Sequence, residues 1–138
     1  MAILSARWEP PIFGYQLPNW LSGRYGAVRK LDAYAELYAD VLRRQRMCLC
    51  GMLAAEYETL SEGMRDAVTL FFEKNEKWLA EVLKQGRDDG TLSFAGSPLD
   101  EARSIVSSLE GAMLIARSFG DIKRFQSAAS HLLATLRP

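Results

Sequence analysis

Two thiols are the first residues of this sequence that could do chemistry. Cys48 and Cys50 stand one residue apart in the uncharged run 47–55, and with the single histidine, His131, they could be taken for metal ligands. On a helix, however, side chains at positions i and i+2 point roughly 200° apart, so the two thiols do not converge on one ion. The sequence therefore predicts no metal site and no cofactor.

Cys48 has two alternative roles. It is either an inert buried cysteine or a reactive thiol whose pKa is lowered by the nearby Arg43, Arg44 and Arg46. His131 falls on the polar side of its expected helix, which predicts a surface position. No residue at a suitable spacing completes a nucleophile–base or acid–base pair with either of them. We therefore expect that the chain is not an enzyme.

Asn75 is the polar residue in the most demanding position. In the periodic stretch that follows Ser61 it shares the inner face with Phe71, Trp78 and Val82. An amide on that face must find hydrogen-bond partners. Either a neighbouring helix or a bound ligand would supply them.

The composition is that of an ordinary globular domain. Of 138 residues, 49% are hydrophobic and 25% charged, and 17 Lys and Arg balance 17 Asp and Glu. No net charge attracts the chain to DNA. The N-terminus lacks the pattern of a signal peptide, and no apolar run approaches the roughly 20 residues that span a bilayer. We therefore expect no membrane contact. Because two close cysteines do not make a disulfide framework, we also expect a cytoplasmic protein.

Residues 1–26 are predicted to form an irregular arm ahead of a helical domain at 27–138. Three prolines and three glycines in this stretch disfavour a helix. A high content of large apolar residues favours an arm that lies against the domain over the alternative of a disordered one. These residues are Trp8, Ile12, Phe13, Tyr15, Leu17, Trp20 and Leu21.

The rest of the chain predicts an all-α fold of about five helices. Apolar periodicity indicates helices over about 28–44 and 46–58, a long one from the capping box 59–62 to about 85–89, and two more at 98–119 and after Asp121. Ser97 and Pro98 mark the start of the fourth helix, and Gly120 marks its end. The second helix has no polar face, so we expect it to be the enclosed central helix.

The fourth helix is apolar around more than half of its circumference, although packing within one domain needs only about 100°. Beside that arc runs a stripe of small residues, and Gly111 costs the helix about 1 kcal/mol relative to Ala, which close packing could offset. We interpret the last two helices as a dimer face, against the alternative of a Ser-rich solvent face. The predicted interface residues are Ser104, Ser107, Leu109, Gly111, Ile115, Ser118, Phe125, Ala129, Leu132 and Leu136.

Several segments resemble one known family. The stretches "CLCGMLAAEYETLSEGMRDAV", "FFEKNEKWLAEVLKQGRDDGTL", "SPLDEA" and "SLEGAMLIARSFGD" are together similar to the C-terminal ligand-binding and dimerisation domain of TetR/AcrR-type transcriptional regulators. The resemblance covers about residues 28–137. It implies that the last two helices form an intermolecular four-helix bundle. In some members that sense electrophiles or oxidants, a cysteine occupies the position of Cys48.

The resemblance also implies a small-molecule effector. In the family, ligand binding alters DNA binding by an N-terminal helix-turn-helix domain, whereas residues 1–26 lack the length, periodicity and basic charge of such a domain. We therefore expect a truncated repressor, natural or from a shifted reading frame, that does not bind DNA by itself. It would bind an apolar or amphipathic ligand and form homodimers, or heterodimers with a full-length relative. The candidate ligand-binding residues are Tyr34, Tyr38, Met47, Cys48, Met52, Phe71, Asn75, Trp78 and Met113.

An alternative to ligand binding stays open at this point. The side chains of the predicted pocket could simply fill the core. The chain would then be a ligand-free helical dimerisation protein that pairs with, or titrates, a partner. In the family, the DNA-binding domain is followed by a helix that forms one wall of the pocket. If the pocket does bind a ligand, the N-terminal arm is expected to cover the wall that the absence of this helix leaves open.

Overall fold

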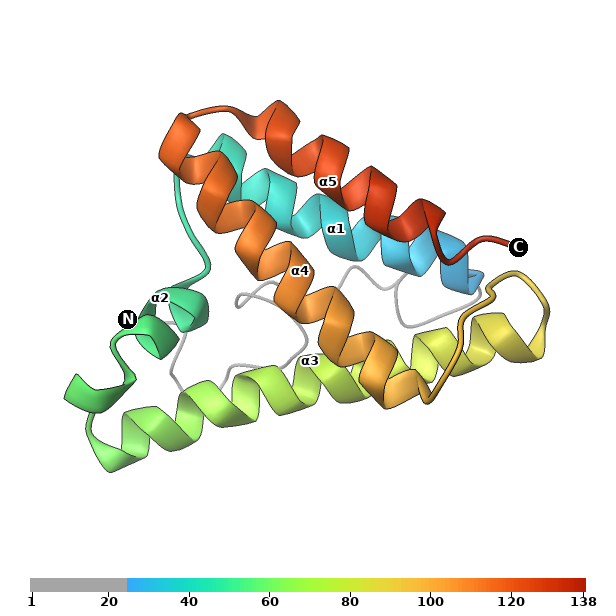
Figure 1. The fold of residues 1–138 in the computed structure, drawn as a ribbon. Coiled ribbons are helices and arrows are strands. Elements are labelled where there is room, and N and C mark those ends of the chain that lie inside the picture. The colour runs from blue at the N-terminus through green and yellow to red at the C-terminus, as the bar shows by residue number, and fades with distance from the viewer. Residues whose placement is uncertain (1–24) are drawn as a thin grey trace.

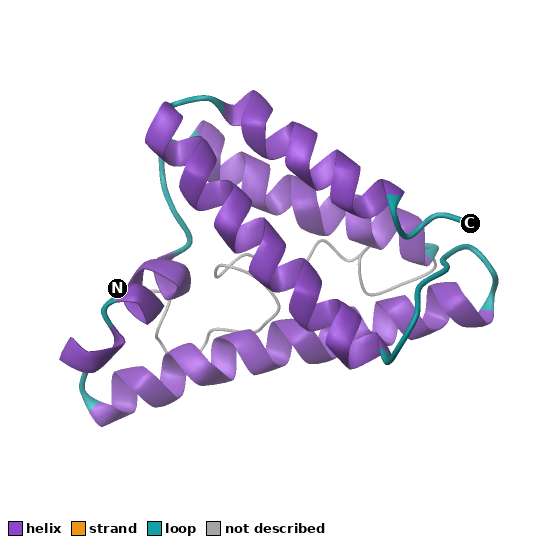
Figure 2. Cartoon of the chain, in the orientation of Figure 1, coloured by secondary structure: helices purple, strands orange, loops and turns teal. Residues whose placement is uncertain are grey.

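The computed structural model describes residues 25–138, and the elements in this part of the chain are helices (Figure 1, Figure 2). In order they are α1 (Ala27–Arg43), α2 (Leu49–Ala55), the 3₁₀ turn η2 (Tyr57–Thr59), α3 (Glu62–Asp88), α4 (Pro98–Phe119) and α5 (Ile122–Ala134). The predicted all-α fold with five helices is confirmed. The predicted arm, residues 1–26, lies almost wholly outside the described residues.

Helix α1 is the central element of the domain. It packs against α3, α4 and α5, while α4 and α5 form an antiparallel pair and α4 crosses α3 (Figure 1). Its apolar residues recur at helical spacing on more than one side, so that several neighbours can cover it. The buried residues of α1 are Ala27, Leu31, Tyr34, Ala35, Tyr38, Ala39, Val41 and Leu42.

The prediction that the second helix is the enclosed centre is wrong. Helix α2 has 7 residues, of which Cys50 is buried, and it lies at one edge of the domain against α3 (Figure 1). Met52 on it is 53% exposed. The uncharged run 47–55 did not predict burial correctly, because the chain turns after α1. Gln45 has a φ of 56° at this turn, and the next helix starts only after Cys48. No long helix forms there that other helices could surround.

The start of α3 also differs from its prediction. Thr59 does not cap this helix; it ends the η2 turn, where its hydroxyl donates to the carbonyl oxygen of Glu56 at 2.7 Å. Ser61 is the N-cap instead, and its hydroxyl accepts from the N–H of Met64. Thr59 and Ser61 are both of a type that commonly caps helices, so the sequence contains two possible start signals for α3. The first, Thr59, is part of the η2 turn instead.

The helix α4 begins and ends as the sequence predicts. Ser97 caps it by accepting a hydrogen bond from the N–H of Asp100 at 3.0 Å, with Pro98 in the first turn. Gly120 ends it with a φ of 62°, a conformation that glycine adopts without strain. Asp121 then caps α5. These signals fix the short corner that makes α4 and α5 an antiparallel pair.

The turn after α3 is closed by a contact between Gly86 and Leu92. The Leu92 side chain lies where a Cβ on Gly86 would be, and the N–H of Leu92 donates to the carbonyl oxygen of Gly86 at 3.0 Å. The N–H of Ser93 donates to the carbonyl oxygen of Leu136 at 2.7 Å. The connector between α3 and α4 is thereby tied to the residues that directly follow α5.

Candidate functional site

A buried chain of polar side chains crosses the middle of the domain. It runs from Asn75 on α3, through Tyr34 and Tyr38 on α1, to Glu110 on α4 and Cys48 in the loop before α2. Asn75 is fully buried, and the two tyrosines are at most 1% exposed. In an apolar core such groups need hydrogen-bond partners, and here they provide them for one another.

The two tyrosines meet because they are four residues apart on one helix. Their hydroxyl oxygens lie 3.2 Å apart, and their rings make an edge contact with centroids separated by 5.4 Å. Tyr34 donates to the Asn75 Oδ1 at 3.1 Å, and the Asn75 amide group donates to the carbonyl oxygen of Phe71 at 2.8 Å. Asn75 therefore bonds to a neighbouring helix, which is one of the two roles predicted for it.

Glu110 is a residue of this candidate site that was not predicted from the sequence. Its Oε1 accepts a hydrogen bond from the Tyr38 hydroxyl at 3.3 Å, and its Oε2 lies against the backbone of Gly51. Burial raises the pKa of this carboxyl group, and bonds from Cys48 and Tyr38 offset only part of that effect. The available signal was an acid in the stripe between Val106 and Met113, positions that both face the core.

Both cysteines are free and buried. Burial, and secondarily the nearby Glu110, raises the pKa of the Cys48 thiol, while burial raises that of Cys50 to about 12. Two of the three arginines that could lower these values are engaged elsewhere, since Arg43 pairs with Glu36 and Arg44 with Asp40. The geometry thus favours the inert cysteine over the reactive thiol.

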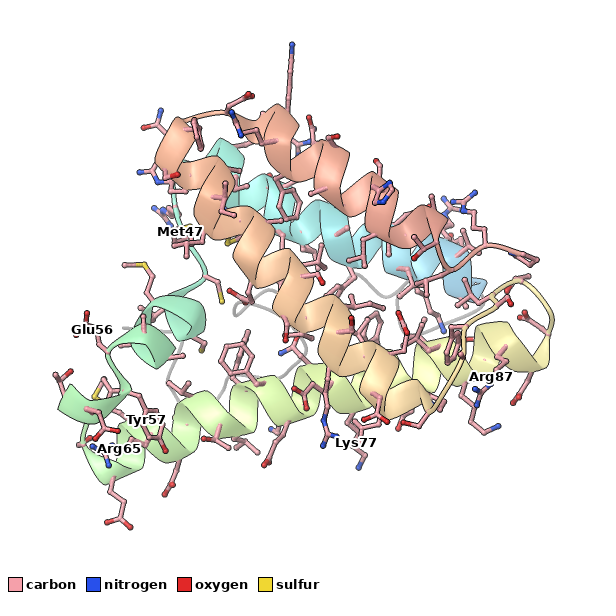
Figure 3. All side chains as sticks on the ribbon, viewed as in Figure 1. Met47, Glu56, Tyr57, Arg65, Lys77 and Arg87 are labelled. Atoms are coloured by element: carbon pink, nitrogen blue, oxygen red, sulfur yellow. The ribbon has the colours of Figure 1, made fainter. Side chains whose placement is uncertain are left out.

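Most of the residues predicted to bind a ligand lie around this polar chain. Trp78 stacks on Tyr34 with ring centroids 5.7 Å apart, and the Met113 sulfur accepts from the N–H of Cys48 at 3.3 Å. Met47 is half-buried in the loop that joins α1 to α2 (Figure 3). The residues that the structure brings together are Tyr34, Tyr38, Cys48, Phe71, Asn75, Trp78 and Met113.

Two side chains on or after α2 do not belong to this cluster. Met52, a predicted ligand residue, is more than half exposed. Glu56 is exposed at the end of α2, away from the cluster (Figure 3). Arg65 holds the following turn by donating to the carbonyl oxygens of Tyr57 and Glu58 at 3.0 and 2.9 Å. This end of the domain is therefore structural surface rather than part of the polar cluster.

The predicted interface residues divide between the surface and the core. Leu109, Phe125, Ala129 and Leu136 are at most 5% exposed because they pack inside this chain, so they are not available to a partner in this conformation. The helical wheel of the sequence did not separate them from their neighbours, since only the packing of α1 shows which side of α4 and α5 is inner. The residues left at least partly open are Ser104, Ser107, Gly111, Ile115, Ser118 and Leu132.

Helix α4 presents an outer face that combines small and large apolar residues. Leu114 is 62% exposed and Ile115 54%, and among the described residues no atom outside the backbone of α4 lies within 4 Å of the position of a Cβ on Gly111. Phe119 is 62% exposed, and the guanidinium of Arg124 on α5 lies 3.6 Å from its ring centroid. An apolar face of this kind on a helix pair is typical of a protein contact surface.

The described residues also contain a hollow between α1 and α5, of about 460 Å³. Its floor includes Phe125 and Leu133, and Asp32 and Arg137 are at its rim. None of the predicted ligand-binding residues lines it. Over the same part of the chain there is no cluster of His, Cys, Asp and Glu that could hold a metal ion, and no helix that is long and apolar enough to cross a membrane.

Comparison with known protein families gives the class of the protein, a domain of transcriptional regulators. The family described as tetracyclin repressor-like, C-terminal domain, matches residues 27–132, and the chain belongs to this family. The resemblance predicted from the sequence is therefore confirmed. The family consists of transcriptional regulators and not of enzymes.

Individual relatives agree with this assignment. The HTH-type transcriptional repressor NemR of Escherichia coli K12 is 33% identical over 91 residues, which are 64% of this chain and 46% of that repressor. The chain thus spans about half the length of this curated relative. A TetR-family regulator from Agrobacterium tumefaciens superposes with a TM-score of 0.82 at 26% identity, covering 87% of this chain and 65% of the other. Reduced NemR superposes with a TM-score of 0.72 at 29% identity, covering 83% and 60%.

Proposed function

We propose that this chain is the effector-binding and dimerisation part of a TetR/AcrR-like regulator, working in the cytoplasm. The observation that carries the proposal is the buried polar chain from Asn75 to Glu110, set among aromatic and thioether side chains within a TetR-type domain. A few polar groups inside an apolar enclosure are typical of small-molecule sites. The effector is accordingly a small apolar or amphipathic molecule.

The polar chain is placed where an effector could act on the fold. It joins α1, α3 and α4, and its end at Cys48 belongs to the loop that precedes α2. A ligand that inserts among these groups must replace their mutual hydrogen bonds and shift at least one helix. The ligand would then bind the shifted conformation more tightly than the unshifted one. Regulation by a ligand requires such a difference in affinity between two conformations.

The second part of the proposal is a homodimer formed through the outer face of α4 and the adjoining part of α5. The small residues Ser104, Ser107 and Gly111 let a second helix approach closely, and Leu114 and Ile115 supply exposed apolar area. Two copies of the α4–α5 pair would make an intermolecular four-helix bundle. The same face would serve a heterodimer with a full-length relative.

DNA binding is not assigned to this domain. The charges of the whole chain sum to zero, so the domain lacks the positive charge that supplies most of the non-specific affinity for DNA. Regulation by these residues would therefore proceed through ligand capture and through pairing with a partner.

Two measurements test the proposal together. Size-exclusion chromatography with light scattering over a range of concentrations should give twice the protomer mass of 15.5 kDa. A thermal-shift screen of apolar and amphipathic compounds should find stabilising ligands, because a ligand that binds only the folded state raises its stability. A monomer that binds no compound would contradict both parts.

One observation favours a second candidate, a dimerisation protein without a ligand. Tyr34, Tyr38 and Asn75 are fully buried and already bonded to one another, as expected of a filled core. A stable dimer that fails to bind any compound of the screen would support this candidate over the effector-binding one.

A further inference from the structure

The hollow between α1 and α5 is a different place from the polar chain. The two helices pack side by side (Figure 1), and side chains of both line the hollow of about 460 Å³. No member of the polar chain is among these lining residues. Small-molecule sites occupy roughly 300–1,000 Å³. The hollow is therefore large enough to hold a ligand of its own.

The floor of the hollow is apolar. Phe125, Ala129 and Leu133 line it from α5, and Ala35 and Ala39 line it from α1. Their spacing of four residues puts each set on one side of its helix. All five side chains are at most 8% exposed. Three of them are alanines, whose short side chains leave space between the two helices. An apolar body in this space would be removed from water on the side of the floor.

Two carboxylates of α1 lie at the rim of the hollow. Asp32 and Glu36 are about one helical turn apart, so they lie on the same side of α1. Asp32 pairs with Arg137 at 3.6 Å, and Glu36 pairs with Arg43. Among the described residues, neither carboxylate has a side-chain partner other than its one arginine. Since a carboxylate can accept several hydrogen bonds, both can bind a further donor.

The charges around the hollow favour a cation over an anion. The lining residues include two carboxylates and one guanidinium, that of Arg137, which already pairs with Asp32. The side chains of the two ion pairs are 43–59% exposed, and exposed ion pairs are weak. A ligand cation can therefore share these carboxylates. A ligand anion would instead meet Asp32 and Glu36 as like charges and would compete with Asp32 for Arg137.

We propose that this hollow binds a small cationic amphipathic molecule, at a site separate from the polar chain. The positively charged nitrogen lies between Asp32 and Glu36, and the apolar body lies on the floor against Phe125. The ring of Phe125 also stacks on that of Tyr38, with ring centroids 6.2 Å apart. The two sites thus share one aromatic contact. The inference goes beyond the proposed function, because it needs no ligand at the polar chain.

Phenylbutylammonium and phenylbutanoate are suitable probes, because they are similar in size and opposite in charge. Calorimetric titration of the full chain at neutral pH should show that the ammonium compound binds at least about tenfold more tightly than the carboxylate compound. Added salt should weaken binding of the ammonium compound, since the ion pairs it makes at the rim are exposed to solvent.

The double variant Asp32→Asn, Glu36→Gln removes both carboxylates and leaves the floor unchanged. These side chains are 55% and 59% exposed, so the variant should stay folded, which circular dichroism checks. Arg137 is then the one charged side chain among the described lining residues. The preference should reverse, so that phenylbutanoate binds more tightly than phenylbutylammonium. The double variant Glu62→Gln, Asp66→Asn removes two exposed carboxylates at the same spacing on α3 and is the matched control.

An ammonium preference that is lost or reversed in the rim variant and kept in the control supports the proposal. Equal binding of the two probes by the wild type overturns it, and so does an ammonium preference that survives in the rim variant. Binding of neither probe overturns it as well. Ammonium affinity that falls as the protein concentration rises would mean that a second copy of the chain fills the hollow, which also overturns the proposal.

Discussion

The carboxylate of Glu110 on α4 lies directly against the backbone of Gly51 on α2, so a Cβ at position 51 would overlap its Oε2. This contact explains why a glycine stands in the middle of a short helix, where it otherwise costs stability. It also joins the polar chain to α2, which is the least buried helix of the domain.

We expect Gly51→Ala to destabilise the protein by about 1 kcal/mol, because the Glu110 carboxyl group must move and lose its bond from Tyr38. Urea denaturation measures the effect. In a Glu110→Ala background the same substitution should cost nothing, since the overlapping atom is gone. Gly63→Ala is the control, because no other described residue lies near its Cβ position. A cost that persists in the Glu110→Ala background would show that helix α2 itself resists alanine.

The stability of the protein should fall as pH rises, relative to that of Glu110→Gln. Burial raises the pKa of Glu110 above its ordinary 4.5, so the folded state binds this proton more tightly than the unfolded state does. The stability that results is fully present below pH 4.5 and is lost as pH rises through the raised pKa of the folded state.

The measurement is urea denaturation of the wild type and Glu110→Gln across that range, because their other titrating groups are the same. The free energy of unfolding of the wild type, minus that of Glu110→Gln, should fall as pH rises and then level off. A constant difference would mean that Glu110 titrates alike in the folded and unfolded protein.

The cysteines should react slowly in the native protein. The pKa of both thiols is raised, to about 12 for Cys50, chiefly by burial, so little thiolate forms at neutral pH. Alkylation by iodoacetamide, followed by mass spectrometry, should be at least about a hundredfold slower than in the unfolded chain. Single Cys48→Ser and Cys50→Ser variants assign each rate. Fast native alkylation of Cys48 would restore the reactive-thiol hypothesis.

Of two substitutions on α4, one should weaken association and the other should weaken folding. Gly111→Glu puts a carboxylate on the outer face, and like charges that meet across an interface should weaken the dimer at least about a hundredfold. Leu109→Ala should instead destabilise the protomer by about 2–5 kcal/mol, because Leu109 is 1% exposed within this chain.

Analytical ultracentrifugation and urea denaturation distinguish the two effects. Gly63→Glu, in the exposed first turn of α3, is the charge control for the association measurement. A dimer that Gly111→Glu leaves unchanged would place the interface elsewhere on the domain.

The sequence predicted most of the helices, because Ser97, Pro98, Gly120 and Asp121 act through local backbone chemistry. It failed at the second helix, since apolar composition does not reveal that the chain turns at Gln45. Local pattern identified Asn75 and the two tyrosines as core residues. The role of Glu110 could not be predicted, because it depends on α1 and α2 approaching α4 from distant parts of the chain.

The most direct test of the effector site is a methyl NMR titration of methionine-labelled protein with phenylbutanol, which carries no charge. Met113 lies fully buried beside the polar chain, whereas Met52 and Met64 lie on the surface or near it. The proposed site predicts that the methyl signal of Met113 shifts and saturates while that of Met64 stays in place. Shifts confined to Met52 and Met64, or no saturable shift of Met113, would contradict it.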